Sequence, residues 1–341
     1  MEQILSALVA IIAGVGGMVL YFYGANWLLD NILKDTITPQ GRVVTSRDRL
    51  REGIRPWLFV GPALFLLGLY LVFPAIQTLI LSFYDTDGVE FVGLANYEWM
   101  LGAPEFHEAV GNNILWLLVV PALSTALGLL IAVLADGVRW GALAKSLIFA
   151  PMAISFIGAS VIWRFMYHAI IPNAGDAPPP QIGLVNAIVV SLGGQPQDWI
   201  TLEFWNNFFL MAILVWIQTG YAMVLLASAL RGVPEETLEA ARIDGAGEIA
   251  IFFRIMVPQI MGTIIVVWTT ITITVLKVFD IVLAMTNGQF GTQVLANLMF
   301  DQAFRAFHDG RGSAVAIFIM VAVIPILYWN IRNYRRAEML R

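Results

Sequence analysis

Long apolar runs alternate with shorter polar segments along the chain, and this alternation predicts helices that cross a membrane. The hydrocarbon of a bilayer is spanned by about 20 apolar residues in a helix, within a range of about 17–25. Runs long enough to span lie at 3–24, 57–83, 111–135, 146–167, 206–229, 259–284 and 312–331. The predicted fold class is therefore an all-α polytopic membrane protein with seven transmembrane helices.

The first apolar run, 3–24, has two interpretations: a retained membrane anchor or a cleaved signal sequence. A signal sequence carries basic residues before its apolar run. Here the only charged residue before the run is Glu2, and the basic residues follow the run instead. The pattern favours a retained anchor.

The positions of Lys and Arg predict the orientation in the membrane, because these residues are retained mostly on the cytoplasmic side. They gather between the first and second spans, the third and fourth, the fifth and sixth, and after the seventh. The other connecting segments hold only Arg305 and Arg311. We therefore expect the N-terminus outside and the C-terminus inside.

Composition agrees with a membrane protein and excludes several other classes. The 341 residues are 59% hydrophobic and 13% charged, against about 25% charged in soluble domains. The absence of cysteine excludes disulfides and thiolate metal sites. His107, His168 and His308 lie in separate loops, and no G-x-x-x-x-G-K-[ST] phosphate loop occurs. We expect no catalytic residue, metal or cofactor in this chain, and no nucleic acid as a partner.

A strongly polar segment, residues 231–258, lies between two long apolar runs, and we call it the elbow. Pro234 suits the first turn of a helix, where its missing N–H costs nothing. Glu235, Glu236 and Glu239 favour the positive N-terminal end of that helix. The segment therefore begins with a polar helix.

Two glycines, Gly245 and Gly247, are expected to end this first helix. A second, apolar helix is expected over 249–257, stopping before Pro258. The sequence thus predicts a helix–glycine–helix shape outside the membrane, suited to docking on a soluble partner. The alternative is an amphipathic helix that lies on the bilayer surface.

The elbow resembles the cytoplasmic loop of permeases from ATP-driven importers, with E-A-A, three residues, G, nine residues, I, one residue and L-P. The matching positions are Glu239, Ala240, Ala241, Gly245, Ile255 and Pro258. Val257 replaces the usual leucine, and Ile243-Asp244-Gly245-Ala246 is similar to the carbohydrate-importer branch. The chain therefore resembles permease subunits of carbohydrate ABC importers, in the maltose-transporter-like family.

Two further segments carry this resemblance. Residues 91–97, FVGLANY, look like the F-V-G-L-x-N-Y segment of sugar permeases, and residues 279–286, FDIVLAMT, look like the outer end of their penultimate helix. That family usually continues with a glycine pair and proline, whereas this chain has NGQFGT at 287–292. The departure resembles the α-glucoside type, whose sugars are sucrose, trehalose, maltose and similar ones, or glucosylglycerol.

The resemblance implies a type I ABC importer permease core and a set of partners. These are a second permease subunit in a heterodimer, two ATP-binding subunits that hold ATP and Mg, a periplasmic or extracellular solute-binding protein, a carbohydrate and membrane lipid. The expected location is the bacterial inner membrane. The expected organisation is an anchor span and basic segment over 1–56, a second span and external loop over 57–110, and the permease core over 111–341.

Within that core, the resemblance assigns ATPase docking to residues of the elbow. The docking residues expected are Glu235, Glu239, Ala240, Ala241, Asp244, Gly245, Ile255 and Pro258. Glu239 would anchor the first helix, Gly245 would permit the bend, and Pro258 would end the elbow where span six begins. ATP-driven closure of the partner subunits would move the elbow, and the elbow would move the spans.

Neutral hydrogen-bonding and aromatic side chains at mid-depth of spans five and six are candidates for the sugar path. They are Trp216, Gln218, Thr219, Tyr221, Thr270, Thr272 and Thr274. Gln218 with Tyr221 is the preferred pair. The alternatives are that threonine hydroxyls bond to carbonyls of their own helix, or that polar groups join helices together. Ser124 and Gly128 are interpreted as close-packing positions.

Ionisable residues within membrane spans are functional candidates by default. Arg164, Lys277 and Asp280 lie near the outward ends of spans four and six, with Lys277 and Asp280 spaced to pair on a helix. They are assigned to an outer gate, and the alternative is that they reach the interface by snorkelling. No carboxylate occupies the middle of a predicted span, which suits a neutral cargo.

Two other classes of function are alternatives to an importer permease. A secondary, ion-coupled transporter is expected to show repeated halves, broken helices or an ionisable group at the midplane, and the sequence indicates none of these. A membrane enzyme needs clustered Asp, His or Ser chemistry, which the scattered histidines do not provide. The sequence favours an importer permease over both.

Overall fold

The structure is a computed structural model, and it describes residues 2–32, 36–37, 43–45, 48–136, 138–172 and 179–339. The chain folds into two compact units, residues 1–77 and 78–341. Several basic side chains on which the predicted orientation rests lie outside the described residues, namely Lys34, Arg42, Arg47 and Arg341. The orientation in the membrane stays a prediction, as do the roles assigned to 1–56, 57–110 and 111–341.

The first unit is built mainly from two long helices. Its elements are α1 (Glu2–Ile32), β1 (Thr36–Ile37), β2 (Val43–Thr45), α2 (Asp48–Leu67), the π-helical turn η1 (Gly68–Val72) and the start of α3 (Phe73–Leu81). The short strands pair antiparallel, with Thr36 opposite Thr45, and the sequence did not predict this ribbon.

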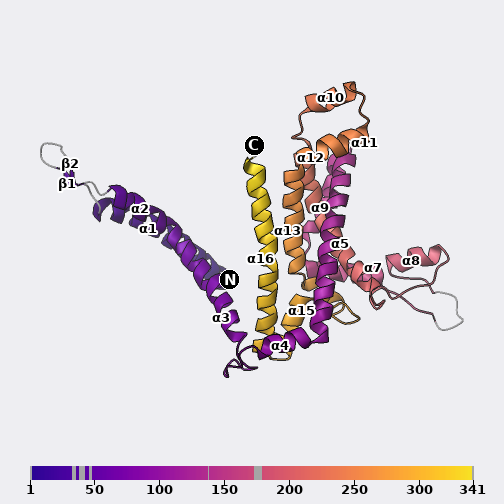
Figure 1. The fold of residues 1–341 in the computed structure, drawn as a ribbon, viewed down its shortest axis with the longest axis horizontal. Coiled ribbons are helices and arrows are strands. Elements are labelled where there is room, and N and C mark those ends of the chain that lie inside the picture. The colour runs from indigo at the N-terminus through magenta and orange to yellow at the C-terminus, as the bar shows by residue number, and fades with distance from the viewer. Residues whose placement is uncertain are drawn as a thin grey trace. The chain divides into compact units, whose positions relative to one another are not determined.

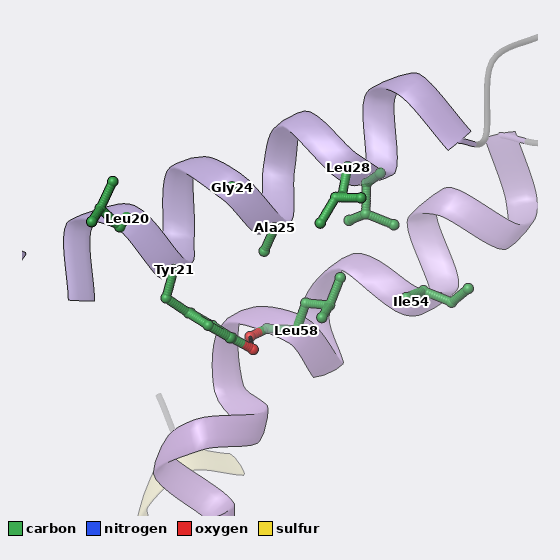
Figure 2. Close-up of a pocket in the computed structure, with 8 residues that line it drawn as sticks. Leu20, Tyr21, Gly24, Ala25, Leu28, Ile54 and Leu58 are labelled. Carbon is green, nitrogen blue, oxygen red and sulfur yellow. Dashed lines mark hydrogen bonds between the residues drawn. The ribbon is translucent and has the colours of Figure 1, made fainter. Parts of the chain in front are cut away.

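One face of α1 packs against α2 through both polar and apolar contacts. Arg55 on α2 donates to the Asn26 amide oxygen at 2.8 Å and to an Asp30 carboxylate oxygen at 3.3 Å. The Tyr21 hydroxyl donates to the Leu58 carbonyl at 3.1 Å. Between the helices lies a groove of about 550 Å³. Figure 2 shows its lining, which is Leu20, Tyr21, Gly24, Ala25, Leu28, Leu29, Ile54 and Leu58.

This groove is almost wholly apolar, and the only polar side-chain atom in that lining is the hydroxyl of Tyr21, which is bonded to a backbone carbonyl. A sugar needs several hydrogen-bonding partners, because its hydroxyls lose water when it binds. The groove therefore does not have the chemistry of a carbohydrate site.

The second unit contains the predicted permease core. Its elements after α3 are α4 (Ala95–Gly102), α5 (Pro104–Leu134), α6 (Gly141–Phe149), the 3₁₀ turn η2 (Ala150–Ala153), α7 (Phe156–Tyr167), α8 (Leu184–Ser191), α9 (Trp205–Leu230), α10 (Glu235–Ile243), α11 (Glu248–Ile251), the π-helical turn η3 (Phe252–Met256), α12 (Val257–Gln259), α13 (Met261–Leu276), α14 (Asp280–Met285), α15 (Leu295–Phe300), the π-helical turn η4 (Asp301–Arg305) and α16 (Asp309–Met339).

The centre of this unit is the pair α5 and α9, against which α13 also packs (Figure 1). The two helices run parallel, because Trp116 on α5 meets Asn207 on α9, and Gly128 meets Ala222 further along both helices. A β-carbon at Gly128 would lie 2.5 Å from that of Ala222, so the glycine permits the close approach. The interpretation of Gly128 as a close-packing position is confirmed.

The elbow and the 287–292 segment lie at opposite ends of the second unit. Figure 1 shows α10 beyond one end of α5, α9 and α13, whereas α4 and α15 lie at the other end. Asn96 at that other end is buried and donates to the carbonyls of Ser82 and Tyr84, at 3.0 and 2.6 Å. This explains the asparagine of the FVGLANY segment as a structural anchor for the turn before α4.

Four helices of the described residues are long and apolar enough to cross a membrane, or up to six if each of two bent pairs counts as one span. The four are Leu5–Asn31, Glu52–Leu81, Pro104–Leu134 and Trp205–Leu230. The predicted seventh span, 312–331, lies within α16. Multiple membrane spans are thus confirmed, and the count of seven stays a prediction.

The prediction of a continuous fourth span over 146–167 was wrong. The chain bends by 107° between Gly141–Ala153 and Phe156–Tyr167. Ile154 is extended, and the Ser155 hydroxyl oxygen accepts a hydrogen bond from the Gly158 N–H at 3.1 Å, which caps the start of a new helix. Serine at this capping position stabilises a helix start, so residue 155 begins α7 rather than continuing α6.

The sixth span, predicted over 259–284, is also interrupted. α13 ends at Leu276, and Phe279 has φ −141° and ψ −59°, outside helical geometry, before α14 begins at Asp280. The sequence argument against a secondary transporter expects unbroken helices, and the two bent helix pairs show that this part of it is wrong. The helices bend at caps and turns that apolar periodicity does not reveal.

Candidate functional site

The first helix of the elbow, α10, begins directly after Pro234, one residue later than the first-turn placement predicted. Pro234 has φ −61° and ψ 130° and occupies the capping position. Glu235 and Glu236 fall in the first turn, where the positive end of the helix dipole favours them. The polar helix predicted from these residues is therefore confirmed.

Gly245 ends α10 in a left-handed turn with φ +85°. The N–H of Ala246 donates to the carbonyl of Ala241, and the N–H of Gly245 donates to the carbonyl of Arg242, both at 3.0 Å. This is the Schellman arrangement, which satisfies carbonyls at the end of a helix and favours glycine at the left-handed position. The predicted role of Gly245 in the bend thus has a backbone explanation.

An ion pair joins the two sides of this turn. Arg242 on α10 donates from Nε to Oε1 of Glu248 at 2.8 Å and from Nη2 to Oε2 at 3.3 Å. The hydrogen bond and the charge of Arg242 lower the pKa of Glu248 below its usual 4.5, and the pKa of Arg242 is raised in return, with smaller contributions from Glu239 and Glu235. Both charges are therefore present at neutral pH.

The second helical segment continues further than predicted. It runs through α11, η3 and α12 to Gln259, so the expectation that it stops before Pro258 was wrong. In η3 the N–H of Val257 bonds to the carbonyl of Phe252, five residues earlier rather than four. This wider turn replaces the i→i−4 hydrogen-bond pattern, which a proline interrupts because it has no N–H. The chain bends at Ile260, by 71° between Glu248–Gln259 and α13.

α10 projects from the unit without being packed into it. All nine of its residues are described, and none is buried. A helix of this length is marginal in water on its own, because nucleation is costly and few bonds form. In the following segment Ile251 is fully buried, and Ile260 at its end belongs to the main core and attaches the segment to the bundle. The elbow is therefore a firmly attached arm with a free outer helix.

The predicted docking residues lie mainly on the accessible part of this arm. Six of the predicted docking residues are exposed, namely Glu235, Glu239, Ala240, Asp244, Gly245 and Pro258. The other two, Ala241 and Ile255, are partly buried. The sequence analysis assigns no docking role to three exposed apolar side chains of the same segment, Ile243, Ile249 and Phe253, with exposed fractions of 85%, 78% and 64%. Apolar residues within a charged segment were the signal that could have found them.

The candidate sugar-path residues of α9 face two different directions. Trp216 and Thr219 line a groove of about 550 Å³ with residues of α5 and α6, including Leu123 and Leu147. Gln218 and Tyr221 are not in its lining, because successive residues turn by about 100° around a helix. The structure therefore does not bring the preferred pair together with Trp216 and Thr219.

Several threonine hydroxyls bond within their own helices, as the alternative interpretation stated. Thr219, Thr270 and Thr274 donate to the carbonyls of Val215, Val266 and Thr270 at 2.7, 2.9 and 3.0 Å. The Thr272 hydroxyl differs, since it is buried and finds no hydrogen-bond partner among the described residues. The buried hydroxyls of Ser124 and Thr125 on α5 also find none in that part of the chain. Sequence reasoning had assigned Ser124 to packing alone.

The outer-gate residues do not form the predicted pair. Within the described residues no ion pair joins Lys277 to Asp280, because the helix ends between them and the i,i+3 spacing is lost. Lys277 and Arg164 are exposed, whereas Asp280 is partly buried at the start of α14. Exposed positions agree with the snorkelling alternative.

The 287–292 segment is held firmly against the beginnings of α5 and α9. Asn206 donates to the Phe290 carbonyl at 2.7 Å, and Asn207 and Asn112 each donate to the Gly291 carbonyl at 3.0 Å. Both Asn206 and Asn207 are buried. The segment that departs from the usual family pattern is therefore an ordered loop over the end of the bundle.

Comparison with known proteins decides between the classes considered. The family model of the binding-protein-dependent transport system inner membrane component matches residues 114–334. The chain belongs to this family. The assignment as a permease of binding-protein-dependent transport is thus confirmed, and it separates this permease from secondary transporters where the broken helices could not.

Two relatives extend over most of the chain. This permease is 59% identical over 337 residues to the alpha-glucoside transport system permease protein AglF of Rhizobium meliloti, covering 98% of each chain. It is 48% identical over 284 residues to the osmoprotective compounds uptake permease protein GgtC of Synechocystis sp., covering 83% of this chain and all of that protein. The chain is therefore similar to sugar importer permeases along most of its length.

The fold resembles that of a solved importer. A chain in the crystal structure of a bacterial ABC transporter that imports the acidic polysaccharide alginate matches with a TM-score of 0.72 at 18% identity, covering 84% of this chain and 99% of that one. At this identity the likeness shows the fold alone. The predicted architecture of an ABC importer permease is confirmed.

Proposed function

We propose that this permease is the membrane-spanning subunit of an ATP-driven importer for an α-glucoside, located in a bacterial inner membrane. The observation that carries the substrate class is the 59% identity to AglF over 98% of both chains. The NGQFGT loop at 287–292 supports it, because it is the segment whose resemblance indicates the α-glucoside type. A neutral sugar also suits spans with no carboxylate at their middle.

The proposed assembly contains a second permease subunit, two ATP-binding subunits that carry ATP and Mg, and an external solute-binding protein. This chain supplies the path and the docking arm rather than a catalytic residue. Closure of the ATP-binding subunits moves α10, and the attached segment from α11 to α12 carries the motion to α13. Attachment through Ile260, which belongs to the main core, supports this role of the elbow.

Uptake measurements test the substrate class directly. In a strain lacking this gene, radiolabelled sucrose, trehalose, maltose and glucosylglycerol are offered one at a time, with lactose as a β-linked control. We expect uptake of at least one α-glucoside to require the gene and to return with the wild-type copy. Unchanged uptake of all four sugars, or a defect confined to lactose, would contradict the proposal.

The energy source is tested in the same strain. Depleting cellular ATP while an ion gradient is maintained should stop the gene-dependent uptake, because the proposed motor consumes ATP. Dissipating the gradient while ATP is maintained should leave that uptake in place. The reverse pattern would indicate an ion-coupled carrier instead.

A further inference from the structure

The apolar groove of the first unit has no part in the proposed sugar path. It lies between α1 and α2, has a volume of about 550 Å³ and is lined on α1 by residues between positions 20 and 29. Figure 2 shows Ala25 and Leu28 on the side of α1 that faces α2. No described atom lies within 4 Å of the β-carbon that a substitution would add at Gly24. The glycine therefore leaves this part of the groove open.

A polar contact lies beside the groove. Arg55, which follows the groove residue Ile54, donates from Nη2 to Asn26 at 2.8 Å and to Asp30 at 3.3 Å. Nε of Arg55 is buried without a partner among the described residues, and Nη1 makes no hydrogen bond in that part of the chain. The Arg55 side chain is 42% exposed. An acceptor from outside the chain can therefore approach the guanidinium.

The sequence places this contact at the level of the lipid headgroups. The predicted apolar runs 3–24 and 57–83 end and begin close to it. Trp27 and Trp57 are 59% and 69% exposed, and tryptophan gathers at the boundary between hydrocarbon and headgroups. Arg55 therefore lies at this boundary, and the groove runs from there into the two spans.

The size and chemistry of the groove restrict what can fill it. The groove follows α1 over residues 20–29, which is about 15 Å of helix. A further helix of that length and about 10 Å in diameter fills roughly 1,200 Å³, about twice the volume of the groove. A sugar would lose its hydrogen bonds with water there and find few new ones. A single hydrocarbon chain is both narrow enough and apolar enough.

The charge of the neighbouring segment selects the headgroup. Residues 30–55 contain six Lys or Arg and four Asp or Glu, and a net positive segment next to a span attracts anionic lipids. The predicted orientation places this segment on the cytoplasmic side, where the leaflet carries negative charge. A phosphate also supplies the acceptor that Nε and Nη1 of Arg55 lack among the described residues.

We propose that the groove between α1 and α2 binds one anionic phospholipid, with an acyl chain in the groove and the phosphate at the guanidinium of Arg55. The inference goes beyond the proposed function, because this lipid is a bound component of the importer rather than its cargo. The lipid would join α1 to α2 in addition to the direct contacts of Tyr21 and Arg55.

The acyl-chain site is tested by native mass spectrometry of the purified importer, stripped of lipid in detergent and then given phosphatidylglycerol. Gly24→Leu places a side chain in the groove, so tightly bound phosphatidylglycerol should fall by about tenfold or more. Gly16→Leu is the matched control, because Gly16 is equally unobstructed and lies outside the groove lining. It should bind lipid as wild type does. Unchanged binding in Gly24→Leu would overturn the proposal.

The headgroup site is tested by the preference for phosphatidylglycerol over phosphatidylethanolamine. Arg55→Gln should lower that preference by about fivefold, since it removes a cation at the membrane surface. Arg55→Lys keeps the charge and should keep most of the preference. Arg139→Gln removes an exposed cation outside the first unit and is the control. An equal preference in wild type and Arg55→Gln would overturn the assignment of the phosphate to Arg55.

A different occupant would give a different result. If a span of another subunit fills the groove, Gly24→Leu should lower the amount of second permease subunit that co-purifies and leave bound phospholipid unchanged, which would overturn the inference. Failure of the proposed function is seen separately, as wild-type α-glucoside uptake that does not require the gene. Loss of bound lipid in Gly24→Leu would support the lipid site whatever sugar is carried.

Discussion

Nε of Arg242 lies 2.8 Å from Oε1 of Glu248, across a turn whose central residue is Gly245. The two residues are six positions apart, so no regular helix would place them side by side. The turn and the ion pair together define the angle between α10 and α11. The elbow is thus a shaped element before any partner binds.

The ion pair predicts a defined pH response of the elbow. The pKa of Glu248 is lowered in the folded chain by the hydrogen bond from Arg242. A group with a lowered folded pKa contributes stability above its unfolded pKa and loses it as the pH falls through the folded value. We therefore expect the elbow to keep its shape from about pH 8 down to about pH 5 and to loosen only in stronger acid.

Spin labels can measure this response, because the chain has no cysteine of its own. Labels at Thr237→Cys on α10 and Ala250→Cys on α11 report the distance between the two segments. A narrow distance distribution at neutral pH should broaden only below the usual glutamate pKa of 4.5, and Glu248→Gln should broaden it at every pH. A distribution that ignores both acid and this change would show that the pair does not hold the turn.

Gly245 and Gly247 should respond differently to the same substitution. Gly245 has φ +85°, which costs an alanine about 1–2 kcal/mol. Gly247 has φ −72°, and no described atom lies within 4 Å of the β-carbon an alanine would add. Gly245→Ala should lower transport and retention of the ATP-binding subunits, and Gly247→Ala should leave both near wild type. Equal effects at the two positions would argue against the left-handed turn.

The close packing of α5 on α9 gives a second matched pair. A β-carbon at Gly128 would meet Ala222 at 2.5 Å and the Met223 nitrogen at 2.8 Å, whereas the β-carbon at Gly111 on the same helix meets no described atom within 4 Å. Gly128→Ala should destabilise the protein by about 1–3 kcal/mol through overpacking, and Gly111→Ala should not. Thermal unfolding in detergent compares them, and equal midpoints would contradict the observed helix spacing.

Thr272 offers a test that separates stability from transport. Its hydroxyl is buried without a partner in the described structure, and an unsatisfied buried polar group costs about 1–3 kcal/mol. Thr272→Val keeps the shape and removes that cost, so the unfolding midpoint should rise by about 2 °C. If the hydroxyl meets sugar when the helices separate, uptake should fall in the same variant. Higher stability with full uptake would remove Thr272 from the path.

How much the sequence predicts depends on the kind of interaction. The length of the apolar runs predicted the long helices α5 and α9 closely, because a helix must be apolar along its whole length to cross the hydrocarbon of a bilayer. The charged residues and the two glycines of residues 231–258 predicted the elbow, because the residues that begin and end a helix are recognisable in the local sequence. Neither signal shows where a long apolar run bends. The break at Ser155 depends on one capping hydroxyl, and the turn at Phe279 depends on backbone geometry.

Apolar length and local helix signals could not predict contacts between residues that lie far apart in the sequence or at spacings no regular helix brings together. Arg242 and Glu248 meet only because Gly245 turns the chain, and Asn207 meets Gly291 only through the folded bundle. The helix-pair prediction for Lys277 and Asp280 failed for the related reason that it assumed an unbroken helix. Local patterns therefore located the elbow, whereas its shape could be seen only in the structure.

The central claim, that an ATP-binding subunit grips the elbow, is tested most directly by site-specific cross-linking in native membranes. A single cysteine at Thr237 on α10 is compared with one at Val89, which is 78% exposed and lies in the segment that leads into α4. We expect Thr237→Cys to cross-link to the ATP-binding subunit, with a yield that changes when ATP is added, and Val89→Cys to give no such product. A cross-link to that subunit from Val89→Cys alone, or products from Thr237→Cys only with lipid or with an external protein, would contradict the account.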